Sequence, residues 1–218
     1  MLFGLACEGV TDQITIENIL CGYFENPDLD DEIIYLQPFL DETDQKRSEG
    51  GWRMLLQYLA SSSFRTDVLN TEFIVLQIDT DISEEFEVIT KNNEGVELSI
   101  DLLVENVKSK LIENINAGEL GFYEKHSGKM IFAISVHSLE CWLVAHYAEI
   151  TEHHNCFDIL KSVINQNDIR VAKKPKNYET LSRPFLERNN IEAAAEKNLS
   201  FRVFIQSLES IRNTIELP

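Results

Sequence analysis

The chain has 218 residues, 44% of them hydrophobic, and a formal net charge of −18 at pH 7. This length predicts one domain, alone or with a helical extension, and the composition suffices for a sizeable hydrophobic core. The charge argues against broad nonspecific binding to DNA, which depends on Lys and Arg side chains facing phosphates, and it favours cationic partners.

Signals for the membrane and for secretion are not expected. No apolar run approaches the roughly 18 residues that span a bilayer, and the N-terminus lacks the basic segment, long apolar core and cleavage site of a signal peptide. The cysteines Cys7, Cys21, Cys141 and Cys156 show no CxxC spacing. We therefore expect reduced, buried thiols in a cytoplasmic protein.

Apolar runs and helical spacings alternate along most of the chain. Strands are predicted over residues 1–8, 33–39, 73–78 and 129–136. Helices are predicted over residues 10–24, 52–59, 98–115 and 138–150. The stretches 41–51 and 82–95 are charged and lack a clear period, so we interpret them as loops or insertions.

After residue 151 only helical patterns occur, near residues 155–166, 176–197 and 200–215. The repeated strand–helix order predicts an α/β fold, with a mostly parallel sheet of about four strands flanked by helices. We assign residues 1–150 to this domain and residues 151–218 to a helical C-terminal extension.

Two of the predicted strands stop at carboxylates. Glu8 follows the first apolar run, and Asp79 and Asp81 follow the third. The carboxyl ends of strands form the ligand crevice of an open α/β sheet, so these three acids would converge if the two strands are neighbours. Their mutual repulsion would be relieved by a cation, and Mg²⁺ takes such oxygen ligands. Alternatively, each acid is an ordinary strand end or helix cap.

The spacing within the second motif adds one expectation. In a strand that continues past its apolar run, residues two apart face the same side. Asp79 and Asp81 would then share an ion. A second expectation concerns Gly9, where a positive φ would make the turn after the first strand intolerant of larger residues.

These motifs resemble those of a known family. Glu8-Gly9-Val10-Thr11-Asp12 looks like the Glu-Gly-x-Thr-Asp signature of the Toprim domain, and Asp79-Thr80-Asp81 looks like its Asp-x-Asp motif. Topoisomerases, DnaG-type primases and nucleases of the OLD (overcoming lysogenization defect) family share this domain. The chain is similar to small stand-alone Toprim-like proteins, which carry a segment like Ser138–Ala145 after the fourth strand. The resemblance covers about residues 1–150.

The resemblance implies roles for individual residues. Glu8 would be a metal ligand or general acid/base, Asp79 and Asp81 would hold Mg²⁺ or Mn²⁺, and Glu140 would be a further ligand, as in OLD-type nucleases that use two metals. Such a metal pair activates the attacking water and stabilises the leaving oxygen of a phosphodiester. For Glu140 an ordinary place in the first turn of a helix capped by Ser138 stays equally open.

The segment Arg170–Lys176 is the one basic cluster of the acidic chain. Its lysines Lys173, Lys174 and Lys176 are candidates for nucleic-acid binding, and the alternative is a solvated loop and helix start. By contrast, residues 79–105 carry nine Asp or Glu and only Lys91 as a base. That stretch holds part of the candidate metal site, and the rest is a solvated face or a surface for a basic partner.

The histidines offer weaker candidates. His137 lies beside the predicted site and could contact a phosphate or donate a proton. His153 and His154 are adjacent, but no Cys or His lies at a standard zinc spacing apart from a loose Cys156, so zinc is not expected.

The first functional hypothesis is a Mg²⁺- or Mn²⁺-dependent nuclease, or a related phosphoryl-transfer enzyme acting on nucleic acid, in DNA processing or in defence against mobile DNA such as phage. The alternative is a non-catalytic or partner-dependent Toprim-like regulatory module that binds another protein such as an ATPase, because the chain itself has no P-loop. A third hypothesis is a phosphohydrolase of small nucleotides. No membrane partner is expected.

Overall fold

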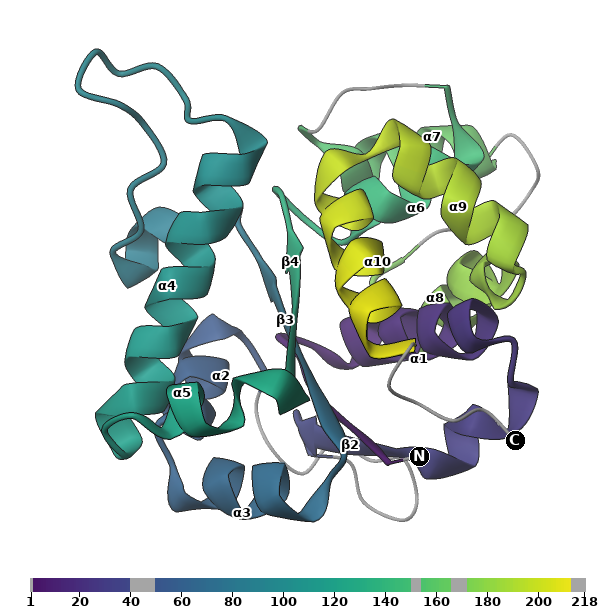
Figure 1. Ribbon diagram of the computed structural model, residues 1–218. Coiled ribbons are helices and arrows are strands. Elements are labelled where there is room, and N and C mark those ends of the chain that lie inside the picture. Colours follow the sequence, from purple (N-terminus) through teal and green to yellow (C-terminus); the bar gives the residue numbers. More distant parts are fainter. Residues whose placement is uncertain (1, 40–49, 150–153, 166–171, 213–218) are drawn as a thin grey trace.

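A four-stranded sheet forms the centre of the protein (Figure 1). The computed structural model describes residues 2–39, 50–149, 154–165 and 172–212. All pairings are parallel, in the spatial order β2-β1-β3-β4. The strands are β1 (Phe3–Ala6), β2 (Ile33–Gln37), β3 (Phe73–Asp79) and β4 (Met130–Ser135). The predicted α/β class, with a parallel sheet flanked by helices and further helices at the C-terminal end, is confirmed.

Helices cover both faces of the sheet (Figure 1). One layer contains α1 (Val10–Phe24), α6 (Glu140–Tyr147), α7 (Cys156–Asn165), α8 (Pro175–Ser182), α9 (Arg188–Lys197) and α10 (Leu199–Arg212). The other contains α2 (Trp52–Leu59), α3 (Ser62–Asn70), α4 (Ile100–Gly118) and α5 (Phe122–His126). Short 3₁₀ helices are η1 (Pro27–Glu32), η2 (Ser83–Phe86), η3 (Ser127–Lys129) and η4 (Arg183–Leu186). Within the described ranges, no helix has the length and apolar character needed to cross a bilayer.

Each helical layer encloses a hydrophobic core against one face of the sheet. In the core on the α1 side, the fully buried Trp142 stacks on Phe201 and Phe204 of α10, with ring centroids 4.8 and 5.5 Å apart. Its indole Nε1 donates to Ser200 Oγ at 2.9 Å, which satisfies the one polar group that this large side chain buries. The C-terminal helices therefore share a core with β1 and α1.

The strand order places a switch point at the middle of the sheet. The chain leaves β1 toward β2 on one side and later returns to β3 on the other, so β1 and β3 are the two central strands. In open parallel sheets the crevice beyond such a point is the usual ligand site. Glu8 and Asp79 come at the carboxyl ends of these two strands.

Some elements differ from those that the sequence predicts. The sequence analysis did not predict the helices α3 and α5. In α3 only Phe64 and Val68 are buried, so the helical spacing of apolar residues is too short to recognise in the sequence. The helix predicted over residues 176–197 is interrupted by η4, where Pro184 cannot donate a backbone hydrogen bond. The helix predicted over 138–150 begins at Glu140 and ends at Tyr147. The loop predicted over 41–51 lies mostly outside the described residues.

The cysteines divide into two pairs. Cys7 and Cys21 are free, buried thiols, in agreement with the prediction. Cys141 and Cys156 instead form a disulfide that joins α6 to α7, with their Cα atoms 5.0 Å apart. The expectation of a reduced thiol is wrong for this pair, because two helices that are separate in the sequence pack their N-terminal ends together.

Gly22 gives a test of the packing between α1 and η4. A Cβ atom at this position would lie 2.0 Å from the backbone oxygen of Phe185. Alanine normally stabilises a helix interior relative to glycine, but here we expect Gly22→Ala to lower the free energy of unfolding by about 1–3 kcal/mol through overpacking. Urea unfolding would measure it, with Gly128→Ala as the control because nothing lies within 4 Å of that Cβ position. Equal stabilities for the two variants would contradict the close contact.

Candidate functional site

The acids that follow β1 and β3 lie together at the carboxyl edge of the sheet. The backbone N–H of Asp79 donates to Glu8 Oε2 at 3.4 Å. Burial, followed by the neighbouring charge of Asp81, raises the pKa of Glu8, while the hydrogen bond from Asp79 opposes this rise. The structure thus brings Glu8, Asp79 and Asp81 to one place, and their catalytic and metal-binding roles stay predictions.

Asp79 is held by hydrogen bonds from three sides. Its Oδ1 accepts from Ser135 Oγ at 2.6 Å, from Gln77 Nε2 at 2.9 Å and from the Leu139 N–H at 3.0 Å. Ser135 is its direct register partner on β4. Burial and then repulsion from neighbouring carboxylates raise the pKa of Asp79 well above its ordinary value. This carboxyl group is therefore fixed in position and costly to ionise.

Gln77 connects the two central strands beneath the acids. Its Oε1 accepts from the Glu8 N–H at 3.2 Å, while its Nε2 donates to Asp79. Gln77 is fully buried and lies two residues before Asp79, on the same side of β3. A polar residue within an otherwise apolar strand, two positions before Asp79, is the sequence signal that marks Gln77, and the sequence prediction did not include it.

Asp81 does not continue the strand. β3 ends at Asp79, and the following turn is held by hydrogen bonds from Thr80 N–H to the Ser135 oxygen and from Asp81 N–H to the His137 oxygen, both 3.0 Å long. The condition under which Asp79 and Asp81 would face the same side of one strand is therefore not met. Partial burial raises the pKa of Asp81, and the charge of Lys173 opposes this rise.

Asp12 is a further member of the cluster that sequence reasoning missed as a site residue. It lies in the first turn of α1 and is buried. Burial, then the charges of Glu140 and Glu8, raises the pKa of Asp12 to about 8, while a hydrogen bond from the Gly9 N–H acts to lower it.

Gly9 itself has an extended backbone with φ −141°, so the positive φ considered for it does not occur. Its Cβ position lies 3.0 Å from Asp12 Oδ2, so a larger side chain would press on this carboxyl group.

Glu140 differs from the other acids because it has strong partners. It is buried in the first turn of α6, where Tyr178 Oη donates to its Oε1 and Lys173 Nζ lies 3.2 Å away. Although burial acts in the opposite direction, hydrogen bonds from Ser138 and Tyr178 together with the ammonium of Lys173 lower the pKa of Glu140. Glu140 is thus an ionised carboxylate whose charge is already balanced by the protein.

Lys173 supplies the test of this balance. We expect Lys173→Met to lower the free energy of unfolding of the metal-free protein by about 1 kcal/mol, since the Lys173 side chain is 60% exposed and the ion pair is partly screened. The neighbouring Lys174→Met is the control, because Lys174 is exposed and forms the N-cap of α8 without a side-chain hydrogen bond. Guanidinium unfolding at low ionic strength would compare them, and an unchanged Lys173→Met would show that the pair contributes nothing.

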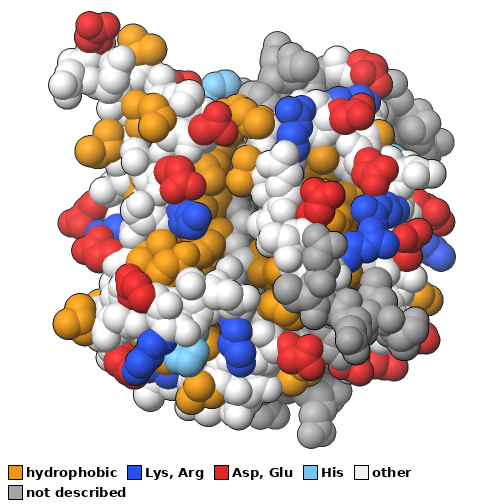
Figure 2. Space-filling model, viewed as in Figure 1, with side chains coloured by type: hydrophobic (Ala, Val, Ile, Leu, Met, Phe, Trp, Pro, Cys, Tyr) orange, Lys and Arg blue, Asp and Glu red, His pale blue; other side chains and the backbone are white. Residues whose placement is uncertain are grey.

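Lys173, Lys174 and Lys176 are all exposed, and Lys173 also pairs with Glu140 at the margin of the acid cluster. Figure 2 shows another face of the protein, where Lys and Arg side chains are interspersed with Asp and Glu, and hydrophobic side chains line the groove between α4 and α10. The nucleic-acid-binding role of the three lysines stays a prediction.

The clustered carboxylates are suitable ligands for a hard divalent cation, but their present positions do not form a coordination site. Carboxylates from three segments gather at one edge, and burial holds the pKa values of Asp12 and Asp79 high. Oxygen ligands of this type are those that Mg²⁺ prefers. Among the residues that the structure describes, however, no three His, Cys, Asp or Glu side chains are arranged to hold a metal ion. Ion binding here would require the carboxyl groups to lose protons and to move together.

A cavity of about 460 Å³ opens beside Asp81. It lies between the turn after β3, the segment leading into α4, and His137. The ring centroids of His137 and His154 are 4.0 Å apart at its margin. His137, considered from the sequence as a phosphate contact, thus lies next to the acid cluster and faces this cavity.

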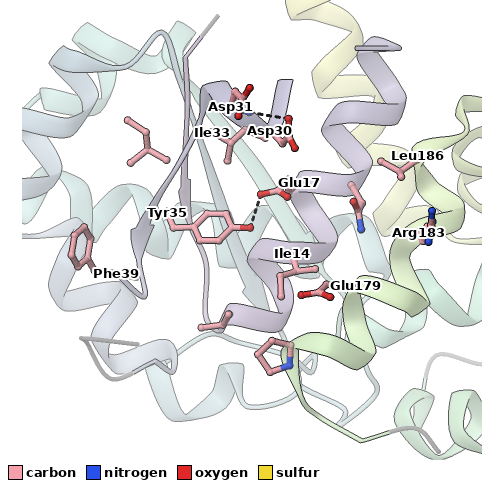
Figure 3. Close-up of a pocket in the computed structure, with 14 residues that line it drawn as sticks. Ile14, Glu17, Asp30, Asp31, Ile33, Tyr35, Phe39, Glu179, Arg183 and Leu186 are labelled. Atoms are coloured by element: carbon pink, nitrogen blue, oxygen red, sulfur yellow. Dashed lines mark hydrogen bonds between the residues drawn. The ribbon is translucent and has the colours of Figure 1, made fainter. Parts of the chain in front are cut away.

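A larger cavity of about 980 Å³ lies apart from the acids, between α1, β2 and α8 (Figure 3). Hydrophobic residues such as Ile14, Ile33 and Leu186 line it, and Tyr35 Oη donates to Glu17 Oε2 across it at 2.5 Å. Among the described residues that line it, the carboxylates Glu17, Asp30, Asp31 and Glu179 outnumber the one guanidinium, Arg183. Because it contains none of the clustered acids, we do not place the chemistry there.

Comparison with known proteins adds no assignment to this geometry. No protein-family model, no curated protein and no solved structure matches the chain.

Proposed function

We propose that this protein is a divalent-cation-dependent phosphoryl-transfer enzyme that hydrolyses phosphodiester bonds in nucleic acid. The observation that carries the proposal is the gathering of Glu8, Asp12, Asp79, Asp81 and Glu140 at the carboxyl edge of the central strands, with the pKa values of Asp12 and Asp79 strongly raised. Burying several carboxyl groups together lowers the free energy of unfolding. Ionisable groups with strongly shifted pKa values are found preferentially at functional sites. The resemblance of two motifs to those of the Toprim domain supports the same proposal.

Four of the five acids have a proposed task. Glu8, Asp79 and Asp81 would hold Mg²⁺ or Mn²⁺, with Glu140 as a further ligand. The bound cation would polarise the phosphodiester and lower the pKa of the attacking water. Ser135 and Gln77 orient Asp79 through their hydrogen bonds to Oδ1, and such outer partners fix the direction of a ligand.

Lys173 has a proposed role in substrate binding. Its ammonium lies beside Glu140 at the margin of the cluster, and an ammonium is a suitable point charge for a phosphate oxygen. In an acidic protein this positive charge would help to offset the repulsion between substrate and carboxylates. A role in DNA processing or in defence against mobile DNA is part of the proposal and rests on the resemblance alone.

The test is metal-dependent cleavage by the purified protein. Supercoiled plasmid and single-stranded oligonucleotide would be incubated with Mg²⁺, with Mn²⁺ or with EDTA, while calorimetric titration with Mn²⁺ measures ion binding. We expect cleavage with either ion and none with EDTA. A protein that neither binds Mn²⁺ nor cuts any substrate would not be such an enzyme.

A second candidate function is supported by the acidic cavity in Figure 3. Its apolar floor and excess of carboxylates suit a Lys- or Arg-rich segment of another protein, as in the partner-dependent regulatory module. Glu179→Lys would then remove partner proteins from a pull-down, whereas Asp79→Asn would retain them. Retention of the same proteins by Glu179→Lys would rule out this cavity as the site of a partner.

A further inference from the structure

The cavity beside Asp81 combines an apolar wall with a polar rim. Its volume of about 460 Å³ falls in the range of pockets for small molecules. Leu98, Ile100, Leu103 and Val136 form the apolar wall. A pocket of this size admits one nucleoside, whereas a base pair within a duplex has no exposed base face to place against such a wall.

Two imidazole rings lie at the same cavity. The His137 and His154 centroids are 4.0 Å apart with their planes inclined by 51°. His137 has a left-handed backbone with φ 65°, an uncommon conformation for a residue other than glycine. The structure fixes it there, since its N–H donates to Thr80 Oγ1 at 2.8 Å and its oxygen accepts from the Asp81 N–H. The His137 ring, on this fixed backbone, and the exposed His154 ring beside it offer a stacking surface for a base.

The polar rim selects against phosphates within the cavity. Glu84 and Glu97 line it together with Lys91, whose Nζ lies 3.9 Å from Glu84 Oε1. Carboxylates repel phosphate groups but accept hydrogen bonds from the N–H groups on the edges of nucleobases. The rim therefore suits the neutral base of a nucleotide, with its phosphate placed outside, toward Asp81.

We propose that this cavity binds one unpaired nucleoside of a single-stranded or frayed nucleic acid, next to the phosphodiester held at the acid cluster. The inference rests on the proposed phosphoryl-transfer function and names its substrate class. Asp81 belongs to both the cluster and the cavity wall, so a base in the cavity has its phosphate near the carboxylates. The enzyme would accordingly prefer single strands to duplexes.

The test fills the cavity with a tryptophan. Leu103 is half-buried in the cavity wall, whereas its neighbour Leu102 is 55% exposed and lies outside it, so Leu103→Trp and Leu102→Trp form a matched pair. Three substrates would be compared: a single-stranded oligonucleotide, the same sequence as a duplex, and bis(p-nitrophenyl) phosphate, a phosphodiester without a nucleobase. We expect the ratio of oligonucleotide to bis(p-nitrophenyl) phosphate turnover to fall about tenfold in Leu103→Trp, the equivalent of one lost stacking contact, and to stay unchanged in Leu102→Trp.

Binding would be followed separately from cleavage. An oligonucleotide containing 2-aminopurine would change its fluorescence in stopped flow when the base enters the cavity, and Leu103→Trp and His154→Ala should both weaken that signal. His154 is exposed, so its truncation keeps the test valid if the tryptophan disturbs folding. Equal effects of the two tryptophans, or duplex cleavage as fast as single-strand cleavage, would overturn the inference. An intact fluorescence response without hydrolysis of any substrate would instead reject the proposed enzymatic function and keep the binding site.

Discussion

Asp79→Asn is expected to lower metal-dependent phosphodiester cleavage about a thousandfold, on the order of 4 kcal/mol of transition-state stabilisation. Asparagine keeps the shape of the side chain, and its oxygen can still accept from Ser135 and Leu139. The negative charge is lost, and with it the principal buried ligand of the proposed ion. Initial rates of plasmid nicking at saturating Mg²⁺ would measure the change, and Mn²⁺ calorimetry would show weaker binding.

The same variant should be more stable than the wild type when metal is absent. In the wild type, burial and neighbouring carboxylates oppose ionisation of Asp79, and Asn removes that charge. Stability at pH 8 in EDTA should therefore rise while activity falls, a pairing that simple misfolding cannot produce. Asp28→Asn is the matched control, because Asp28 is exposed in η1, far from the acids, and neither property should change. Retention of full activity by Asp79→Asn would remove Asp79 from the mechanism.

The meeting of Glu8 and Asp79 could be predicted because it depends on simple local signals. Each residue follows a short apolar run, and a parallel sheet places the carboxyl ends of its strands at one edge. The only further requirement is that the two strands be neighbours, which the order β2-β1-β3-β4 satisfies. The α/β class follows from the same alternation of strands and helices.

The remaining members of the cluster could not be predicted because their environment comes from distant segments. Asp12 reads as an acid in a first helical turn, and only the folded chain buries it beside Glu140. Glu140 in turn is paired with Tyr178, 38 residues further along the chain. No periodicity in the sequence reports such contacts. The disulfide between Cys141 and Cys156 is another case, since it depends on how α6 meets α7.

The charges and protonation states of the clustered acids affect how the protein would bind a metal ion. Glu140 already has Lys173 and Tyr178 as partners, whereas Asp12 and Asp79 are stabilised in their protonated forms by burial. In the metal-free protein, bound protons and the Lys173 ammonium thus reduce the repulsion between the carboxyl groups. A divalent cation would do the same in the metal-bound protein. Metal binding should release protons, as it does wherever ligands must ionise first.

The raised pKa of Asp12 therefore predicts that stability falls as the pH rises. Its pKa is about 8 in the folded protein against an ordinary value of 3.8, so the folded state binds a proton more tightly than the unfolded state between these values. The free energy of unfolding must then fall as the pH rises from about 4 to about 8. At about 1.4 kcal/mol for each pH unit, the loss amounts to several kcal/mol.

Glu140 acts in a separate pH window, because its pKa is lowered and its contribution is lost only as the pH falls below the ordinary range of a glutamate. Asp12→Asn should make the fall in stability at neutral pH less steep, because only the share of Asp79 remains, and it should leave the acidic limb intact. Urea unfolding of the metal-free protein from about pH 2 to about pH 9 would measure both limbs. Saturating Mg²⁺ should restore stability most strongly at the upper end, where the carboxylates are ionised and repel one another. A metal-free protein whose stability is constant between pH 5 and pH 8 would show that Asp12 is not desolvated beside the other acids, and the proposed ion site would then lack its driving force.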